Sequence, residues 1–530
     1  MEFSAPADYA GVRTRNPRVI AELSHKDCPM TRRHVLSTTA RRGLLAAIIL
    51  SSSVSGGLAQ SARKTPLAAP LAAPLAAPLA MTAGMQQGAG IRTLQQALAA
   101  AYANSPTLLA ARAGVRATDE SVPAAIAGWR PQVTITGSGG GAFGSNTTES
   151  LFGNQKSNQQ RSEYAASASI TQPIYRGGRT VAGINRAENQ VMAARAQLQA
   201  TEQQVFTDTV TAYVGVISNG QVLQLDANNE QVLQKQLQAT NDRFRVGEIT
   251  RTDVAQAEAA LAQATATRQA QEGQLQTSRA NFQRQTGELP DRLIEPQPLQ
   301  LPGRDQAAIV AMSVANNPNV VAALFNDAAV REAFNLAYAQ LMPNVSLQAQ
   351  AFYTNGQQQA GLINRGESII GTVTVPIYQG GSEYAAIRQA RQQEQQARKQ
   401  LDDQRRIATQ QAVTNYQTYV AAKATIVSNR AAIRANEIAL EGVQREAIVG
   451  SRTTLDVLNA EQALLNSRVT LVQSLANFVT DSYAVANATG RLTAYDLNLA
   501  VPLYDVNAYY RAVKDLWIGT DDFATGQPGR

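Results

Sequence analysis

The sequence predicts a mainly α-helical protein that is internally duplicated and has a small β part in each copy. The phrase QPIYRGGRT at 172–180 returns as VPIYQGGSE at 375–383, which is 203 residues later. Two segments, 174–289 and 377–501, contain no proline over 116 and 125 residues. Short segments that alternate polar and apolar residues precede both of them, as is typical of half-buried strands.

The duplication extends well beyond that phrase. VGEITRTDVAQAEAAL at 246–261 lies over VGSRTTLDVLNAEQAL at 449–464 with the same offset of 203. Upstream of the strands the offset is 212, so the first copy holds nine extra residues between Pro131 and Pro173. An offset that changes at one place indicates a duplication with a longer loop in one copy. We therefore expect repeat 1 at 91–290, repeat 2 at 291–500 and a C-terminal tail at 501–530.

The start of the chain carries features of protein export. Residues 30–60 combine a basic start, a short apolar run and small residues at Gly57 and Ala59, as in a secretory signal peptide. Met30 is an alternative start to Met1. TRRHVL also resembles a twin-arginine signal, but we favour the general export route. We expect 1–59 to be an N-terminal extension and signal peptide.

A proline-rich segment follows the predicted signal. Proline recurs every fourth residue, at 66, 70, 74 and 78. Regular proline prevents both helix and strand, so 60–90 is predicted to be an extended linker.

Composition argues against an enzyme. Both histidines, His25 and His34, and the only cysteine, Cys28, precede the predicted cleavage region. The exported part therefore has no residue for a Cys/His zinc site, a cysteine nucleophile or a histidine general base. It also lacks a cysteine for a lipid anchor. Carboxylate-only or lysine-based chemistry is the remaining alternative, but no pattern in the sequence arranges it. We predict no catalytic residues, no cofactor and no metal.

Charge argues against a nucleic-acid partner. The net charge of +7 includes eight basic and four acidic residues of the first 59, which leaves 39 of the 47 basic and 36 of the 40 acidic residues. The exported part is close to neutral, whereas a nucleic-acid-binding surface needs a basic excess.

Both proline-free segments are predicted to form long helical hairpins, because Ala, Gln, Arg and Glu favour helix. The outgoing helix at 179–246 has 68 residues and would span roughly 100 Å at about 1.5 Å per residue. The return helices, about 253–285 and 456–488, are half as long. Shorter helices at 93–128 and 305–341 are predicted to stack end to end with them.

The break between outgoing and return helix is predicted to be a sharp turn. Gly247 and Gly450 can supply the left-handed residue that ends a helix. The pairs at 252–253 and 455–456 then open the next helix, with an aspartate near its positive end.

No 18-residue apolar stretch follows the signal, so we predict no membrane-spanning helix. The apolar stripe of the long helices is thin and rich in alanine, so each helix needs neighbours on both sides. A fibrous coiled coil and a wall element of a larger helical assembly are the two interpretations.

Four segments alternate polar and apolar residues with a period of two. They are 132–136, 164–171, 344–352 and 368–376. The connections at 144–162 and 354–366 are long, polar and rich in Gly, Asn and Gln. Short alternating strands with long loops at one end are typical of transmembrane β-strands. A small soluble sheet with aromatic residues at its edges is the alternative.

Aromatic residues flank the four strands. Those at the helix side are Trp129, Tyr175 and Tyr378, and those at the loop side are Phe143, Tyr164, Phe352 and Tyr353. They predict two aromatic girdles in the membrane interfaces. Four strands are too few for a barrel, and an open edge in lipid leaves backbone groups unpaired. We therefore expect a dimer with eight strands or a trimer with twelve.

The repeated phrase is predicted to be the corner between strand and long helix. Its proline ends the strand ladder, its tyrosine lies at the membrane interface and its two glycines form the turn. A phosphate-binding loop is excluded because no Lys-Ser/Thr follows the glycines. The corner residues are Pro173, Tyr175, Gly177, Gly178, Pro376, Tyr378, Gly380 and Gly381.

With these features the sequence resembles the TolC-like outer-membrane efflux protein family over about residues 91–505. The doubled corners and the doubled VG…T..DV..AE.AL hairpins carry the resemblance. It implies a homotrimer in outer-membrane lipid, whose twelve strands form a barrel continuous with a twelve-helix α-barrel tunnel in the periplasm. It also implies export without chemistry, as the exit duct of a type I protein secretion or tripartite efflux system.

The resemblance implies two protein partners, a periplasmic adaptor (membrane fusion) protein and an inner-membrane pump of the ABC or RND type. The family character of QPIYRGGRT and of the tail favours protein cargo over drugs. The tail is similar to C-terminal extensions of some members and is expected around the equator of the tunnel. A trimeric coiled-coil surface fibre or adhesin with a barrel anchor is the alternative, which strands inside both repeats disfavour.

In the family the hairpin tips close the periplasmic entrance and meet the adaptor. The resemblance implies an ion bridge between Arg452 and Asp253, with Asp456 facing the pore. Ala447 stands where a tyrosine usually joins this network, and Asn459 replaces a second pore-facing aspartate, so we expect a looser gate. Helix capping and a solvated arginine are the alternatives. The implied adaptor-contact residues are Val246, Gly247, Thr250, Val449, Gly450 and Thr453.

Overall fold

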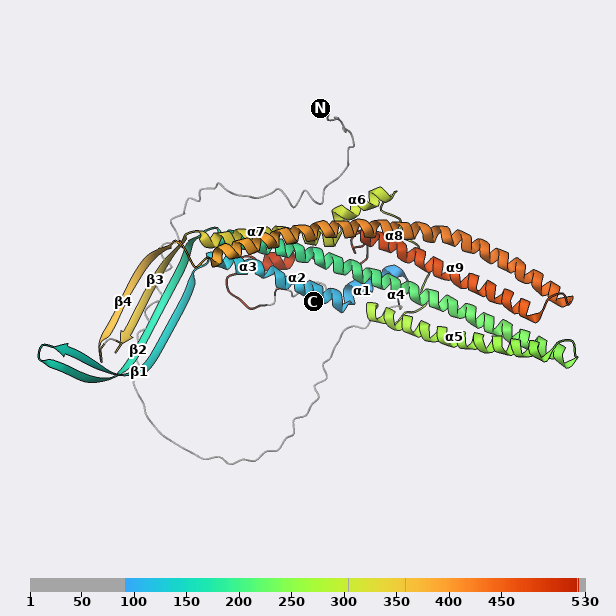
Figure 1. Ribbon diagram of the computed structural model, residues 1–530, viewed down its shortest axis with the longest axis horizontal. Helices are drawn as coiled ribbons and strands as arrows, with labels where there is room; N and C mark the ends of the chain where they lie inside the picture. Colours follow the sequence, from blue (N-terminus) through green and yellow to red (C-terminus); the bar gives the residue numbers. More distant parts are fainter. Residues whose placement is uncertain (1–90, 304, 358, 522, 524–530) are drawn as a thin grey trace, which may run out of the picture. The chain divides into compact units, whose positions relative to one another are not determined.

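The computed structural model describes residues 91–303, 305–357, 359–521 and 523. The predicted export signal, the proline-rich linker and residues 524–530 of the tail lie outside this part. Within it the chain repeats one order of elements: short helices, a β-hairpin, a long helix and a shorter return helix (Figure 1). The predicted mainly α-helical, internally duplicated fold is confirmed.

The elements of the first repeat precede those of the second without intermixing. Repeat 1 consists of α1 (Leu94–Asn104), α2 (Pro106–Asp119), α3 (Ser121–Ile126), β1 (Gln132–Ser150), β2 (Gly153–Arg176), α4 (Arg179–Arg245) and α5 (Arg251–Thr286). Repeat 2 consists of α6 (Gln306–Asn316), α7 (Pro318–Tyr338), β3 (Asn344–Asn355), β4 (Ile363–Thr374), α8 (Ser382–Ile448) and α9 (Thr454–Ala488). Short 3-10 turns at Ala127–Trp129 and Ala339–Leu341 precede β1 and β3, and α10 (Ala508–Val513) lies in the tail.

The long helices are continuous, as predicted, with 67 residues in both α4 and α8. The shorter helices are not. Ser105 and Asn317 adopt extended conformations, with ψ of 118° and 124°, and each is followed by a proline that starts the next helix. Because proline disfavours helical geometry in the residue before it and suits the first helical position, each predicted helix is split in two.

Return helices and short helices meet end to end, which confirms the predicted stacking. The Asn317 side chain donates a hydrogen bond to the Ala488 carbonyl at the end of α9 (3.3 Å). In the first repeat, Gly287 after α5 lies beside Asn104 at the end of α1, where an added Cβ would be 3.8 Å from the Asn104 Cβ. Each wall is thus one long helix beside a broken one.

The expectation that no membrane-length apolar helix follows the signal is wrong for one run. By length and composition alone, Gln306–Leu341 could cross a membrane. This run is α6 and α7 with the break at Asn317 between them. Since α7 packs against both α4 and α8, and Asp327 on it is buried, we assign the run to the helical wall.

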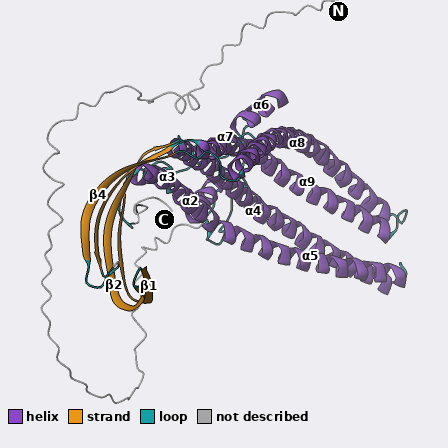
Figure 2. Ribbon diagram, turned by 60° about the vertical axis from the view of Figure 1, so that its left-hand side comes forward, coloured by secondary structure: helices purple, strands orange, loops and turns teal. Residues whose placement is uncertain are grey.

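The four strands form one antiparallel sheet in the order β1-β2-β3-β4. The pairing of β2 with β3, from Tyr164 opposite Asn355 to Arg176 opposite Asn344, joins the two repeats. The sheet is strongly curved (Figure 2). Its edge strands, β1 and β4, have no further partner among the described residues, as expected of a sheet that closes only with other copies.

The first β-hairpin is much longer than predicted. Residues 144–162 were expected to be a loop, yet β1 and β2 pair without interruption to Ser150 opposite Gly153, around Leu151 and Phe152. In the second repeat only 356–362 remain outside the strands. A hairpin with both faces polar has no period-two pattern in its sequence, although its backbone ladder is the same.

The two corner prolines differ in effect. Pro376 lies two residues after Thr374, the last residue of β4, so the ladder has ended before it, in line with the prediction. For Pro173 the prediction is wrong, because β2 continues to Arg176 and its register against β3 shifts between Pro173 and Tyr175. A proline cannot donate a ladder hydrogen bond and is tolerated at such a bulge.

The main hydrophobic core lies where α1, α2, α4, α5 and α9 pack together. The rings of Tyr213 and Phe282 meet at 6.2 Å between centroids. The Tyr213 hydroxyl lies within hydrogen-bonding distance of the carbonyl oxygens of Arg92 and Ile294, at 2.8 and 2.7 Å, and its single proton is shared between them. Burial of this hydroxyl raises the pKa of Tyr213 to about 12. The start of the described chain and the linker between the repeats are therefore both fastened to α4.

The tail packs on the first repeat. The Tyr504 backbone N–H donates to the Tyr102 hydroxyl (3.1 Å), and the Arg112 guanidinium lies between these two rings, 4.4 Å from Tyr102 and 5.3 Å from Tyr504. Further along, Arg195 of α4 donates to the Asn507 side chain at 2.7 Å. Cation–π contacts and these hydrogen bonds fix the tail against α2 and α4.

Candidate functional site

The two hairpin tips lie at the ends of the long helices that point away from the sheet (Figures 1 and 2). In the first tip α4 is capped by Val246, and Gly247 follows with a φ of 81°. In the second tip Val449 and Gly450 take the same places, and the φ of Gly450 is 82°. Both glycines occupy the left-handed region, so the predicted sharp turns are confirmed.

The return helices begin with a capping box in both repeats. Thr250 is the N-cap of α5, and its N–H and hydroxyl donate to Asp253 Oδ2 at 3.0 and 2.6 Å. Thr453 makes the equivalent bonds to Asp456 Oδ2 at 3.0 and 2.9 Å. The helices thus start at Arg251 and Thr454, slightly earlier than the predicted pairs at 252–253 and 455–456.

These hydrogen bonds set the charge of the tips. The hydroxyl and N–H of Thr250 lower the pKa of Asp253, with a further contribution from Arg243. Hydrogen bonds from Thr453 and the charge of Arg452 lower the pKa of Asp456. Both aspartates therefore stay ionised well below neutral pH, so each of them contributes one negative charge to its tip.

Arg452 binds a different carboxylate from the one expected. Its Nε donates to Glu446 Oε2 at 2.8 Å, across the turn of its own tip. Within one chain the bridge to Asp253 does not form. A bridge from Arg452 to Asp253 of a neighbouring subunit stays a prediction, as does the pore-facing role of Asp456.

The two tips have opposite charge orders. In the first, Arg243 on the long helix pairs with Glu248 in the turn at 2.7 Å. In the second, Glu446 on the long helix pairs with Arg452 in the turn. Glu446 lies 203 residues after Arg243, so the repeat alignment puts opposite charges at one structural position. Arg243, Glu248 and Glu446 were not among the tip residues predicted from the family motif. The alignment of the two repeats could have indicated them.

Both tips also expose apolar side chains. Val246 is 77% exposed, and Ile448 and Val449 are 81% and 78% exposed. Asn459 is also exposed, whereas Ala447 is half-buried. Side chains of this kind, exposed at the end of a rigid hairpin, suit a protein contact.

Two buried carboxylates lie behind the tips, where α9 meets α4 and α5. Asp226 and Glu461 line a cavity of about 100 Å³ and are 5% and 8% exposed. Glu461 Oε2 has no hydrogen-bond partner in the described part of the chain. Burial raises the pKa of both groups, while a hydrogen bond from the Gln444 side chain partly opposes this at Glu461.

We expect Glu461→Gln to raise the thermal midpoint of the assembled protein by a few degrees at pH 7. The folded-state pKa of Glu461 lies above its ordinary value of 4.5. Stability is therefore lost as the pH rises from 4.5 through the raised pKa, and glutamine removes that loss. Below pH 4 the variant and the wild type should unfold alike. Glu441→Gln, on an exposed face of α8, is the matched control, and an equal gain there would contradict the explanation.

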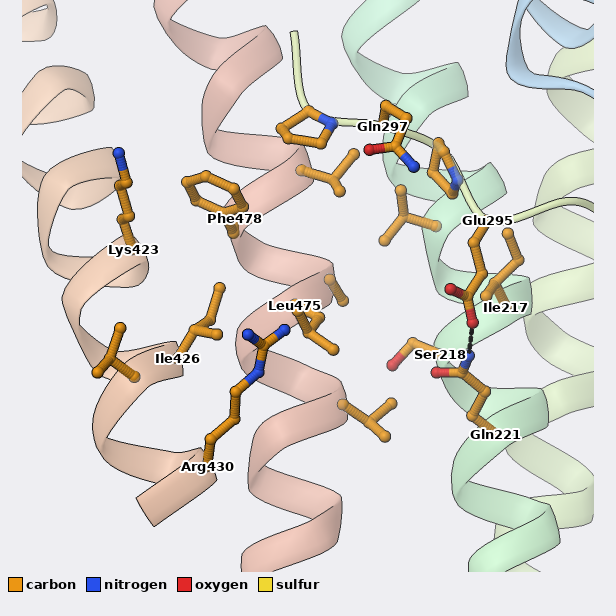
Figure 3. Close-up of a pocket in the computed structure, with 17 residues that line it drawn as sticks. Ile217, Ser218, Gln221, Glu295, Gln297, Lys423, Ile426, Arg430, Leu475 and Phe478 are labelled. Carbon is orange, nitrogen blue, oxygen red and sulfur yellow. Dashed lines mark hydrogen bonds between the residues drawn. The ribbon is translucent and has the colours of Figure 1, made fainter. Parts of the chain in front are cut away.

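A larger cleft of about 470 Å³ lies between the two hairpins at the level of the inter-repeat linker (Figure 3). Helix α9 forms its floor, and α8 and α4 flank it. Gln221 of α4 donates to the Glu295 carboxylate of the linker, and Lys423 and Arg430 of α8 lie on the opposite side. The floor of the cleft between these charged side chains is apolar.

The strand–helix corners form as predicted at their glycines. Gly177 and Gly178 have φ values of 60° and 83°, and Gly380 and Gly381 have values of 76° and 85°. Gly178 and Gly381 are the N-caps of α4 and α8. The corner tyrosines, Tyr175 and Tyr378, are 45% and 76% exposed.

Comparisons with known proteins agree with this architecture. The family model described as outer membrane efflux protein matches residues 97–288 and 310–491, one segment in each repeat. The outer membrane efflux protein BepC of Brucella suis biovar 1 (strain 1330) is 34% identical over 434 residues, which cover 82% of this chain and 93% of BepC. The alkaline protease secretion protein AprF of Pseudomonas aeruginosa is 22% identical, with 70% of this chain and 78% of AprF covered.

Solved structures show the same fold. The crystal structure of the outer membrane protein VceC from Vibrio cholerae superposes with a TM-score of 0.64 at 22% identity. The match covers 75% of this chain and 96% of VceC.

Proposed function

Because the chain belongs to the outer membrane efflux protein family, we propose that it is the passive exit duct of a type I secretion or tripartite efflux system, closed at rest by its hairpin tips. Its place is the outer membrane, with a helical tunnel in the periplasm. Members of the family are channels rather than enzymes. They work in trimeric assemblies with periplasmic adaptors and inner-membrane pumps.

The observation that carries the proposal is the four-stranded sheet with two open edges. The described part of one chain supplies four strands, and within it β1 and β4 are each unpaired on one side. Three copies would pair these edges into a twelve-stranded barrel, with one long and one broken helix from each repeat in the tunnel wall. A fibre with a barrel anchor has no need for a strand pair inside each repeat.

The opposite charge orders of the tips support a gate at the periplasmic end. In a closed trimer a first-repeat tip would stand between two second-repeat tips. Each carboxylate at a turn, such as Glu248, would then face an arginine at the next turn, such as Arg452. Adjacent tips would attract one another, and the exposed Val246 and Val449 would remain for the adaptor.

The identity of the cargo follows from the pump and adaptor rather than from the duct. One relative is named for efflux and another for the secretion of a protease. Both uses need the same passive channel. Protein cargo with an ABC-type pump, rather than a drug with an RND-type pump, stays a prediction.

Single-channel recording in a planar bilayer tests the proposed function. We expect the purified trimer to give small, stable, ohmic conductance steps, because closed tips leave a narrow path through the tunnel. If an assembled trimer is silent and stays silent when the tip charges are removed, the duct proposal is wrong. The fibre with a barrel anchor would then take its place.

A further inference from the structure

The end of the described tail lies at the base of the sheet. Arg130, two residues before β1, donates a hydrogen bond from Nη1 to the Leu516 carbonyl (2.6 Å). Its guanidinium also lies 4.9 Å from the centre of the Trp517 ring. Trp129 is fastened to the same place, because its carbonyl accepts from the Gln172 side chain of β2 (2.8 Å). Trp129 and Trp517 therefore stand at one level, where the strands meet the helices.

The tail exposes its largest apolar side chains at this level. Trp517 is 66% exposed and Ile518 is 90% exposed, although Leu516 before them is partly covered. A soluble tail gains nothing from presenting a tryptophan and an isoleucine to water. Ile174 and Tyr175, at the helix end of β2, are exposed as well.

Tryptophan is favoured at membrane–water interfaces because its ring has an apolar body and a polar N–H. We propose that residues 516–518 form an interfacial anchor, which inserts Trp517 and Ile518 into the inner, periplasm-facing phospholipid leaflet of the outer membrane. This inference rests on the proposed function, because it needs the sheet to span that membrane. The anchor continues the aromatic girdle that Trp129, Tyr175 and Tyr378 form at the strand–helix corners.

The charges around the anchor suit an interface more than an electrostatic docking site. Arg130 and Lys514 are basic, whereas Asp515 and Asp521 on the same tail are acidic and exposed. Because the tail carries charges of both signs, we assign the contact to its aromatic and apolar side chains. A neutral phospholipid surface is accordingly sufficient, and anionic lipid is not required.

The contacts that hold the tail along the first repeat also position the proposed anchor. The exported part of the chain has no cysteine that could carry a lipid. Cation–π contacts of Arg112, Arg195 and Arg130 with Tyr504, Tyr510 and Trp517 instead lead the tail along α2 and α4 to the sheet. A second membrane contact, separate from the strands, is thereby held by ordinary side-chain packing.

Tryptophan fluorescence tests the anchor, because the chain has only two tryptophans. Trp129→Phe leaves Trp517 as the only reporter, and Trp517→Phe leaves Trp129 as the matched control. Both trimers are reconstituted into phosphatidylcholine vesicles with bromine atoms near the headgroup end of the acyl chains. We expect the emission of Trp517 to be quenched as strongly as that of Trp129, relative to unbrominated vesicles.

The outcomes separate the anchor from the duct. Quenching of Trp129 without quenching of Trp517 would overturn the anchor and leave the membrane position of the sheet intact. A blue-shifted but unquenched Trp517 would mean that a neighbouring subunit covers it, which also overturns the anchor. If neither tryptophan is quenched, the sheet is not in the membrane, and the proposed function fails together with the anchor.

A labelled variant keeps the test independent of tryptophan substitution. Because no cysteine follows the predicted cleavage region, Ile518→Cys creates a unique thiol in the exported protein. A nitroxide on that thiol should be more accessible to oxygen, which concentrates in lipid, than to a water-soluble nickel chelate. The same label at Asp505, on an exposed part of the tail away from the sheet, should show the reverse preference. Equal behaviour of the two labels would overturn the anchor.

Discussion

Arg452→Ala is expected to raise the resting conductance of the reconstituted channel severalfold. The substitution removes the ion pair with Glu446 across the second tip and leaves that carboxylate unneutralised. It also removes the only basic residue of the second turn. One exposed ion pair contributes little, but three symmetry-related tips lose theirs together. Single-channel recording of the purified trimer gives the measurement.

Arg445→Ala is the matched control for this prediction. Arg445 is exposed near the same tip, but it pairs with Glu441 on its own helix. We expect its removal to leave the conductance unchanged. If an assembled Arg452→Ala trimer conducts like the wild type, the gate assignment is wrong.

Exchanging the charges of Glu446 and Arg452 distinguishes two roles of Arg452, which are to stiffen its own turn or to contact the neighbouring tip. Glu446→Arg combined with Arg452→Glu can restore the pair within each tip, but it gives both tips the same charge order. Wild-type conductance in this double variant would mean that the pair only stiffens its own turn. A persistent leak would mean that Arg452 meets a carboxylate of the neighbouring tip. Adding Asp253→Asn to Arg452→Ala then tests Asp253 as that partner, since asparagine can still accept the capping hydrogen bonds.

Gly177→Ala is expected to abolish most of the assembled trimer. Gly177 has a φ of 60°, and an added Cβ would lie 2.3 Å from Met342 Cβ and 2.9 Å from the Ala339 carbonyl oxygen. No side-chain rotation relieves a contact with these atoms, so the backbone between β2 and α4 must move. That movement would separate the first corner from the start of β3. The yield of folded trimer after extraction, and its thermal midpoint, give the measurement.

The second repeat provides the control for this corner. Gly380 occupies the matching position with a φ of 76°, but no atom lies within 4 Å of its added Cβ. Gly380→Ala therefore carries only the conformational cost of a left-handed alanine, roughly 1–2 kcal/mol. We expect it to assemble with a modest loss of stability. Equal losses in both variants would show that conformation, rather than the contact with Met342, decides the effect.

The parts of the fold that depend on local chemistry could be predicted from the sequence. A long alanine- and glutamine-rich segment without proline strongly favours helix, and α4 and α8 are continuous over 67 residues each. A glycine after such a helix, followed by Thr-x-x-Asp, ends one helix and starts another by backbone geometry alone. The tip turns and the glycine corners therefore needed no knowledge of the rest of the chain.

Other features could not be predicted from the sequence, because they depend on residues that are far apart along the chain. The polar ends of β1 and β2 pair through backbone hydrogen bonds that leave no hydrophobic period. Pro173 remains in a strand because β2 has an irregularity between Pro173 and Tyr175, where its register against β3 shifts. Asn317 and Pro318 divided a run whose composition would suit a membrane, and packing against α4 and α8 gave it a different environment.

By itself, the sequence determined that this protein is a duplicated helical hairpin with two strands per copy, because repeat, capping and helix continuity are properties of neighbouring residues. Which charges meet, and where the tail lies against the rest of the chain, depends on the tertiary packing. Arg452 pairs with Glu446 because the turn brings the two side chains together. Trp517 lies beside Arg130 because the tail packs along α2 and α4. Such contacts join residues through the packing of whole elements, and a linear pattern does not record them.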